Sequence, residues 1–182
     1  MTRPVRVPPV APQDLDDATT AVLGSAPQKG RLHLPAVVAQ HPTLLAPYMA
    51  WATAVARHGV LTARDNALLA LRTALRCGSE FEWGVHIAHG HLTTDEEERV
   101  AMGPGAGWSA RDAALLRAAD ELHDQSVVSD STWAELAVMF PTDALLEIVF
   151  VVGHYTMLSM VANSAGVQPE PDWAALGRAH EV

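Results

Sequence analysis

Glu82 and His86 lie four residues apart and are the clearest candidates for chemistry in this sequence. Residues at this spacing share one face of a helix and can touch. A carboxylate beside an imidazole fixes the tautomer of the ring and raises its pKa, which makes a general acid or base. The pair therefore predicts a site that gives a proton to a substrate or takes one from it.

Ser79 lies one helical turn before Glu82, where a helix is expected to begin. Backbone N–H groups at a helix start are unpaired and favour an anion, so Ser79 is a candidate for substrate binding. A structural explanation competes with this one, because Ser79 and Glu82 have the spacing of a capping box. If they form a site, we expect a pocket at the start of this helix that both Glu82 and His86 reach.

Further polar and aromatic side chains could complete such a site. Arg72 and Arg76 share a helix face upstream and are candidates to hold a substrate carboxylate, with solvated surface residues as the alternative. Trp83 could form an apolar wall of the pocket, together with Trp51. Aromatic residues at helical spacing are more commonly part of the core, which is the alternative for both.

His154 and Tyr155 interrupt an otherwise apolar stretch, and Glu147 lies two turns earlier on the same face. Buried polar groups need partners, so these side chains either line the pocket or bond to one another in the core. The sequence leaves both outcomes open, and His154 and Tyr155 are counted among the candidate substrate-binding residues.

The histidines and the single cysteine give little support for a metal or a disulfide. His86, His89 and His91 lack the His-Glu-x-x-His spacing of a zinc-binding helix. Cys77 stands alone, which excludes an intrachain disulfide and a cysteine-rich metal site. Cys77 is expected to be a small buried apolar residue, with a reactive thiol before a helix start as the alternative. We expect an enzyme with no metal and no organic cofactor.

Helical signals position these residues, and no run shows the alternation of a strand. Pro42 sits in the first turn of one expected helix, and Thr62 with Asp65 marks the start of another. The pattern predicts an all-α fold of six to seven helices. The chain divides into an extended proline-rich arm, a helical domain and a polar C-terminal tail: residues 1–30, 31–166 and 167–182.

The chain has 182 residues, of which 49% are hydrophobic and 18% charged, so a sizeable core is expected. A net charge of −9 argues against binding to nucleic acid or to an anionic membrane surface. The apolar stretch 144–162 carries Glu147 and His154, which favours a buried helix over a membrane span. Because the N-terminus shows no targeting signal, we expect a cytoplasmic protein. Its expected partner is a small-molecule substrate.

The stretch 76–86 reads Arg-Cys-Gly-Ser-Glu-Phe-Glu-Trp-Gly-Val-His and resembles the signature of the carboxymuconolactone decarboxylase family. That family belongs to the alkyl hydroperoxidase D-like (AhpD-like) superfamily, which also contains thiol peroxidases. The resemblance extends from about residue 6 to about residue 166, with supporting features at His41-Pro42 and Gly153-His154-Tyr155. It implies the all-α AhpD-like fold and self-association into a homo-oligomer, a trimer or a hexamer.

The resemblance favours the decarboxylase-type branch over the peroxidase branch. Peroxidase members carry Cys-x-x-Cys-x-x-x-His, and alignment on His86 places Ser79 and Glu82 at the two cysteines. A serine hydroxyl cannot exchange disulfides, so an antioxidant peroxidase is the weaker alternative. The branch without paired cysteines implies a cofactor-independent lyase that transfers a proton on a small organic acid, lactone or enolisable carbonyl compound. His86 would move the proton with Glu82 as its partner; a non-catalytic ligand-binding oligomer is a further alternative.

Overall fold

The computed structural model describes residues 3–24 and 33–170, and within these ranges the regular structure is entirely helical. The all-α prediction is confirmed. The expected six to seven helices are too few, because short segments before residue 40 and after residue 93 also form helices. A 3-10 turn (Pro12–Asp14) precedes α1 (Asp17–Gly24), α2 (His33–Val38), α3 (Pro42–Arg57), α4 (Ala63–Arg76), α5 (Glu80–His89), α6 (Thr94–Met102), α7 (Ala110–Gln125), α8 (Asp130–Met139) and α9 (Thr142–Ala165).

Capping residues fix where several helices begin and end. The Thr62 hydroxyl accepts from the Asp65 backbone N–H, and the Asp65 carboxylate accepts in return, so a full capping box starts α4. Thr93 and Glu96 form the same box at α6, and their spacing is the sequence signal for that helix. α5 ends at Gly90, whose φ of 65° lies in the left-handed region that glycine adopts without strain.

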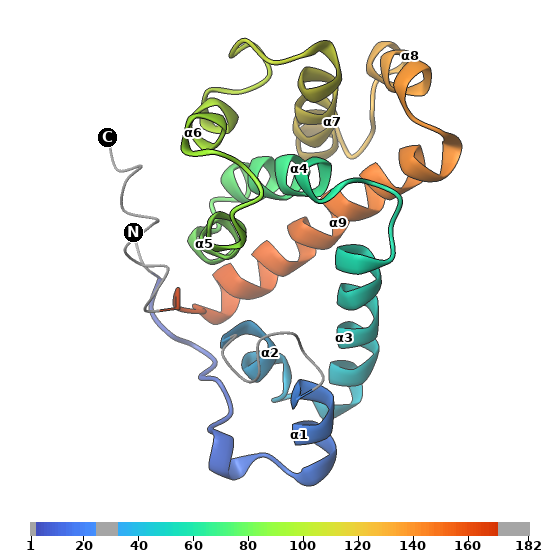
Figure 1. Cartoon of the computed structure of the whole chain (residues 1–182). Helices are drawn as coiled ribbons and strands as arrows, with labels where there is room; N and C mark the ends of the chain where they lie inside the picture. Colours follow the sequence, from blue (N-terminus) through green and yellow to red (C-terminus); the bar gives the residue numbers. More distant parts are fainter. Residues whose placement is uncertain (1–2, 25–32, 171–182) are drawn as a thin grey trace.

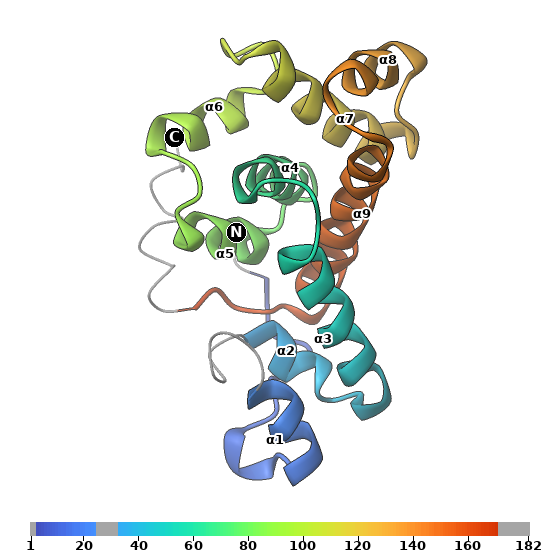
Figure 2. The same ribbon diagram turned by 45° about the vertical axis from the view of Figure 1, so that its right-hand side comes forward.

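Helix α4 lies at the centre of one half of the molecule, with α5, α6, α7 and α9 packed around it (Figure 1). Figure 2 shows this helix nearly end-on within its neighbours, while α1, α2 and α3 form the opposite end of the molecule. α4 is therefore buried on most of its surface rather than along one stripe. Its buried apolar residues are Ala67, Leu68, Leu69, Ala70, Leu71 and Ala74.

Ion pairs at a constant sequence separation of 48 residues join α4 and α7. Arg72 Nε lies 2.7 Å from Asp120 Oδ1, and Arg76 pairs with Asp124 one turn further on. A constant separation means that the two helices run parallel and in register. Asp120 Oδ1 also lies 3.6 Å from Arg76 Nε, so the ion pairs of Arg72 and Arg76 form one continuous set.

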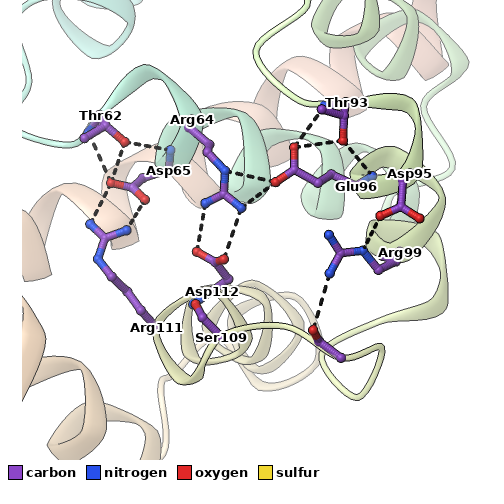
Figure 3. Close-up of polar contacts among 11 residues, drawn as sticks. Thr62, Arg64, Asp65, Thr93, Asp95, Glu96, Arg99, Ser109, Arg111 and Asp112 are labelled. Atoms are coloured by element: carbon purple, nitrogen blue, oxygen red, sulfur yellow. Dashed lines mark hydrogen bonds and ion pairs between the residues drawn. The ribbon is translucent and has the colours of Figure 1, made fainter.

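At the start of the two helices the pairing becomes reciprocal (Figure 3). Arg64 of α4 binds Asp112 of α7 at 2.9 Å, while Arg111 of α7 binds Asp65 of α4 at 2.8 Å. Arg64 also holds Glu96 of α6 at 2.7 Å. Parallel helices bring the positive ends of their dipoles together, and carboxylates in the first turns offset that repulsion.

The N-terminal segment packs along its own chain. The backbone N–H groups of Arg6 and Val7 both donate to the Ala165 carbonyl, at 2.8 and 3.0 Å. Further along, Val10 donates to the Ala36 carbonyl at 3.0 Å. The expected arm contains α1, and its residues 1–2 and 25–30 lie outside the described ranges. The expected tail is described only to residue 170, so its remainder, 171–182, also lies outside them.

Helix α9 is long and apolar enough to cross a membrane by length and composition, with a mean hydropathy of 1.7 over its most apolar window. Half of that window is buried inside the molecule, and α9 contacts α3, α4, α5, α7 and α8. It is the core helix that the sequence predicts. Its outward face nevertheless exposes a row of large apolar side chains, here called the α9 stripe: Leu146, Phe150, Met157 and Met160.

Candidate functional site

Ser79 is the N-cap of α5, and its hydroxyl accepts from the Glu82 backbone N–H at 3.3 Å. The expected capping box is only half formed. The Ser79 backbone N–H donates to the Ala74 carbonyl at 2.9 Å instead of to the Glu82 carboxyl. Capping therefore explains Ser79 but leaves the Glu82 side chain without that role.

The Glu82 carboxyl is buried, with 2% of the residue exposed. Its Oε1 atom is enclosed and has no hydrogen-bond partner among the described residues. Burial raises the pKa of Glu82 to about 8, because an ionised carboxylate loses its hydration there. Glu82 therefore carries a proton at neutral pH, as an acid rather than as a carboxylate.

His86 lies one turn further along α5 and is also buried, with its Nε2 atom enclosed and without a hydrogen-bond partner in the described chain. Burial, and to a smaller extent the neighbouring His89, His154 and His91, lower its pKa to about 3. The expectation that Glu82 raises the pKa of His86 is wrong, because a protonated carboxyl carries no negative charge that would stabilise the protonated imidazole. His86 is a neutral base.

Tyr155 of α9 packs edge-on against the His86 ring, with ring centroids 4.5 Å apart and an interplanar angle of 87°. Its hydroxyl donates to Asn66 Oδ1 of α4 at 3.3 Å. Burial raises the pKa values of Tyr155 and Tyr48, and the nearby Glu82 raises both further. Tyr155 thus lies against His86, and both tyrosines interact electrostatically with Glu82. Glu82, His86, Tyr155 and Tyr48 are here called the Glu82–His86 cluster.

Tyr48 reaches this cluster from α3, and the sequence analysis did not identify it. It is part of the helix Pro42–Arg57, more than 30 residues before Glu82, and no motif or spacing connects the two. Only the packing of α3 beside α9 brings Tyr48 to the cluster. Asn66 was missed for the same reason, because it lies on a helix with many buried neighbours and no distinguishing pattern.

His154 is held by Trp51, whose indole Nε1 donates to His154 Nδ1 at 3.1 Å. An accepting Nδ1 carries no proton, so the ring is neutral, and burial lowers its pKa to about 4. Glu147 does not join it. The Glu147 carboxylate instead accepts from the backbone N–H groups of Val60 and Leu61, at 2.6 and 3.2 Å. The structure thus separates Glu147 from the polar group that contains His154 and Tyr155.

Arg72 and Arg76, expected to hold a substrate carboxylate, point to α7 rather than to the cluster. Arg72 makes two bonds to Asp120 and donates from Nη1 to the Val100 carbonyl at 2.8 Å. These contacts tie α4 to the end of α6 and to α7, so both arginines are structural in this arrangement. Trp83 is buried in the main apolar core.

A small pocket does open near the start of α5, but Glu82 and His86 do not line it. Its walls include Gly78, Glu80 and Phe81 on one side and Ala162 and Asn163 on the other. The expected pocket shared by Glu82 and His86 is therefore not formed there, and the cluster is enclosed. Among the described residues, no three His, Cys, Asp or Glu side chains are placed to hold a metal ion.

Cys77 follows the last residue of α4 and is half-buried. Its Sγ lies 3.7 Å from His123 Nδ1. Burial raises the pKa of the thiol, although contacts with Thr156, Ser159 and Arg76 act in the opposite direction. The thiol is therefore less ionised at neutral pH than a free cysteine, which opposes nucleophilic use.

No protein-family model matches the sequence, and a search of curated proteins finds no match. Several solved structures are similar in fold. An AhpD core from Ralstonia eutropha JMP134, an uncharacterized peroxidase-related protein, has a TM-score of 0.73 at 17% identity, covering 97% of this chain and 98% of that one. The debrominase Bmp8 without ligand has a TM-score of 0.77 at 14% identity, covering 94% of this chain and 96% of its own.

A second Bmp8 structure is a cysteine-to-alanine variant in complex with 2,3,4-tribromopyrrole. It has a TM-score of 0.76 at 14% identity, covering 96% of this chain and 97% of that one. ATU0492 from Agrobacterium tumefaciens, a protein of unknown function whose name relates it to the antioxidant defence protein AhpD, matches at 18% identity with a TM-score of 0.67. This match covers 72% of the present chain and 94% of ATU0492. The likeness shows that the chain adopts the AhpD-like helical fold.

Proposed function

We propose that this chain is a cofactor-independent acid–base enzyme of the carboxymuconolactone decarboxylase-like kind. It acts on a small lactone, organic acid or enolisable carbonyl compound. The observation that supports the proposal is a pair of enclosed atoms one helical turn apart, Glu82 Oε1 and His86 Nε2, which have no hydrogen-bond partner within the described part of the chain. Burial raises the pKa of one group and lowers that of the other, and such oppositely shifted pairs are typical of acid–base sites.

The chemistry follows from these two protonation states. The Nε2 atom of His86 removes a proton from the carbon next to a substrate carbonyl, and the C–H electron pair moves to the carbonyl oxygen. The Glu82 carboxyl donates a hydrogen bond to that oxygen as negative charge develops, and the Tyr48 hydroxyl is the second candidate donor, since Tyr155 donates to Asn66. Return of the proton from His86 to carbon completes an isomerisation or an exchange.

Decarboxylation would use the same groups in another order. The bond between the carboxylate and the neighbouring carbon breaks, carbon dioxide leaves, and the electron pair again moves to the carbonyl oxygen. The resulting enolate then takes a proton at carbon. This lyase reaction needs a carboxylate on the substrate. Arg72 and Arg76 were the expected partners of that carboxylate, but both form ion pairs with carboxylates of α7 instead.

The peroxidase alternative has weaker support. The similar structures include peroxidase-related proteins, but thiol peroxidation requires a thiolate. Here Ser79 occupies the position of the first cysteine of the resembled motif, and the pKa of Cys77 is raised.

The fold itself also accommodates small ring compounds, since a Bmp8 structure contains 2,3,4-tribromopyrrole.

Exchange of α-protons tests the proposal without knowledge of the product. Small ketones, lactones and β-keto acids are incubated with the protein in D2O, and NMR follows deuterium uptake next to the carbonyl. We expect at least one compound to exchange faster with the protein. Glu82→Gln and His86→Asn should each reduce that exchange by about a hundredfold or more.

His91→Asn is the matched control, because His91 is exposed and lies just after the end of α5. It should retain most of the exchange rate. Exchange that is undiminished in His86→Asn, or no exchange with any compound tested, would contradict the proposed function.

A further inference from the structure

We propose that the Glu82–His86 cluster selects an uncharged substrate, a small ketone, lactone or ester, over a free carboxylic acid. This inference rests on the proposed function, because it concerns the same site. It also goes further, since the resemblance alone allows organic acids as substrates. Three structural observations carry it: the engagement of the arginines, the neutral groups that face the cluster, and the enclosure of the cluster.

The first observation concerns positive charge. Every arginine from α4 to α8 is paired with a carboxylate, and these helices contain no lysine: Arg64, Arg72, Arg76, Arg99, Arg111 and Arg117. Arg57 of α3 is exposed at the end of its helix. In these helices, then, an anion bound beside Glu82 would find no unengaged guanidinium group to balance its charge.

The second observation is the set of groups that face the cluster from each packed helix. α3 contributes Tyr48, α4 contributes Asn66, and α9 contributes His154 and Tyr155, each an uncharged donor or acceptor. His89, the nearest further imidazole on α5, lies 5.9 Å from the His86 ring between centroids. These groups suit a carbonyl oxygen, which needs one or two hydrogen bonds and no counter-charge.

The third observation is the burial of the site. The pKa of Glu82 shows how these surroundings act on a carboxyl group. The residue is 2% exposed, and in residues 3–24 and 33–170 no cation stabilises the ionised form of its carboxyl. Surroundings that raise the pKa of Glu82 to about 8 would oppose the ionisation of any other carboxyl placed there. A substrate acid would have to take up a proton to enter, whereas an ester or a lactone would not.

Selection of an uncharged substrate favours a proton shift over decarboxylation. Loss of carbon dioxide requires an ionised carboxyl on the substrate, which the cluster disfavours. A proton shift requires none: a C–H bond breaks, His86 Nε2 carries the proton, and a new C–H bond forms at another carbon of the same molecule. No oxidant, reductant or leaving group is needed for this step.

Matched pairs of probes test the inference through binding rather than turnover. Methyl levulinate is compared with levulinate, and methyl benzoate with benzoate, by competition in ligand-observed NMR at pH 7. We expect the ester of each pair to bind at least tenfold more tightly. Equal or tighter binding of either carboxylate would overturn the inference.

A salt series separates desolvation from simple repulsion, because the net charge of −9 would also repel anions. Repulsion between solvated charges weakens between about 0.05 and 0.5 M NaCl, whereas the desolvation of a buried anion changes little. The ester preference should persist at the higher salt concentration, and its collapse would overturn the inference. If esters bind preferentially but no carbonyl compound exchanges deuterium, then the proposed function fails and the binding selectivity stands.

Discussion

The Glu82 carboxyl and the His86 imidazole are one helical turn apart, and burial shifts their pKa values in opposite directions. An ion pair is the usual expectation for such neighbours on a helix. Among the described residues no cation stabilises an ionised Glu82, and His86 is buried, so the neutral forms of both are favoured instead. The site therefore holds a protonated carboxyl and a neutral imidazole side by side near neutral pH.

Glu82 should lower the stability of the protein progressively as the pH rises from 6.5 to about 8. In this range the folded protein keeps a proton on Glu82 that the unfolded chain, with a pKa of 4.5, has released. His86, His89 and His154, whose pKa values are lowered by burial, act in the opposite direction and make stability rise with pH until about one unit above 6.5. Measured relative to Glu82→Gln, the free energy of unfolding of the wild type should thus decrease by up to about 1.4 kcal/mol per pH unit, and by less near pH 8, where Glu82 is half ionised in the folded protein.

Urea unfolding of the wild type and of Glu82→Gln at several pH values measures this effect. The variant has no ionisable group at position 82, so its stability should not fall over the same range and should rise slightly as the histidines of the unfolded chain lose their last protons. Equal slopes for the two proteins would assign the pH dependence to other groups.

Cys77 should contribute neither a disulfide nor an essential thiol. Addition of reductant should leave the melting temperature unchanged, because Cys77 is the single cysteine of the chain. Cys77→Ser should retain α-proton exchange, since the thiol takes no part in the proposed step. A shift of more than a few degrees on reduction would instead indicate a link between subunits or a modified thiol.

The sequence identified the central pair because Glu82 and His86 are local neighbours on one helix. It could not identify the partners of Arg72 and Arg76, which are 48 residues further along the chain. It also gave the wrong direction for the pKa of His86. Whether a carboxyl is ionised depends on burial and on distant charges, and neither can be seen from a four-residue spacing.

At the level of helices, the pairing of α4 with α7 fixes the frame around the cluster. The two parallel helices are joined by arginine–carboxylate pairs at their starts (Figure 3) and by further pairs along their length. Helix starts were predictable because capping residues are local, as at Thr62 and Ser79. The parallel pairing was not predictable, because the crossover through α5 and α6 leaves no periodic signal in the sequence.

Breaking the middle pair should destabilise the fold strongly. Asp120→Asn leaves the guanidinium group of Arg72, whose side chain is 9% exposed, without its counter-charge. Loss of one partner of a buried ion pair costs about 3 kcal/mol or more. Chemical denaturation should show a decrease of that size in the free energy of unfolding.

Asp95→Asn is the matched control, since it removes the same charge from an exposed pair with Arg99 in which Asp95 is 78% exposed. Such surface pairs contribute less than about 1 kcal/mol. Similar losses in the two variants would show that the α4–α7 pairs are no more important than surface contacts.

For the whole molecule, the α9 stripe is the main exposed apolar feature of the helix that passes through the core. Phe150 in this stripe packs edge-on against the exposed Trp51, with ring centroids 5.6 Å apart. Contiguous apolar surface of this kind is typical of interfaces between subunits. It is consistent with the homo-oligomer that we propose from the resemblance.

We expect sedimentation to give a trimer or a hexamer at micromolar concentration. Leu146→Glu combined with Met160→Glu should shift the protein toward a monomer of 19.4 kDa, because both substitutions place charge in the α9 stripe. Val138→Glu is the control, since Val138 on α8 is 87% exposed but lies outside the stripe. A monomeric wild type would contradict the assembly.

The protonation state of Glu82 tests the central claim most directly and requires no substrate. Infrared difference spectra of the wild type and Glu82→Gln detect the C=O stretch of a protonated carboxyl. At pH 6.5 we expect a carboxylic acid band in the wild type that is missing in the variant and that disappears as the pH rises through about 8. A Glu82 that shows only carboxylate bands at pH 6.5 would contradict the account, because the cluster would then hold a charge rather than a neutral acid and base.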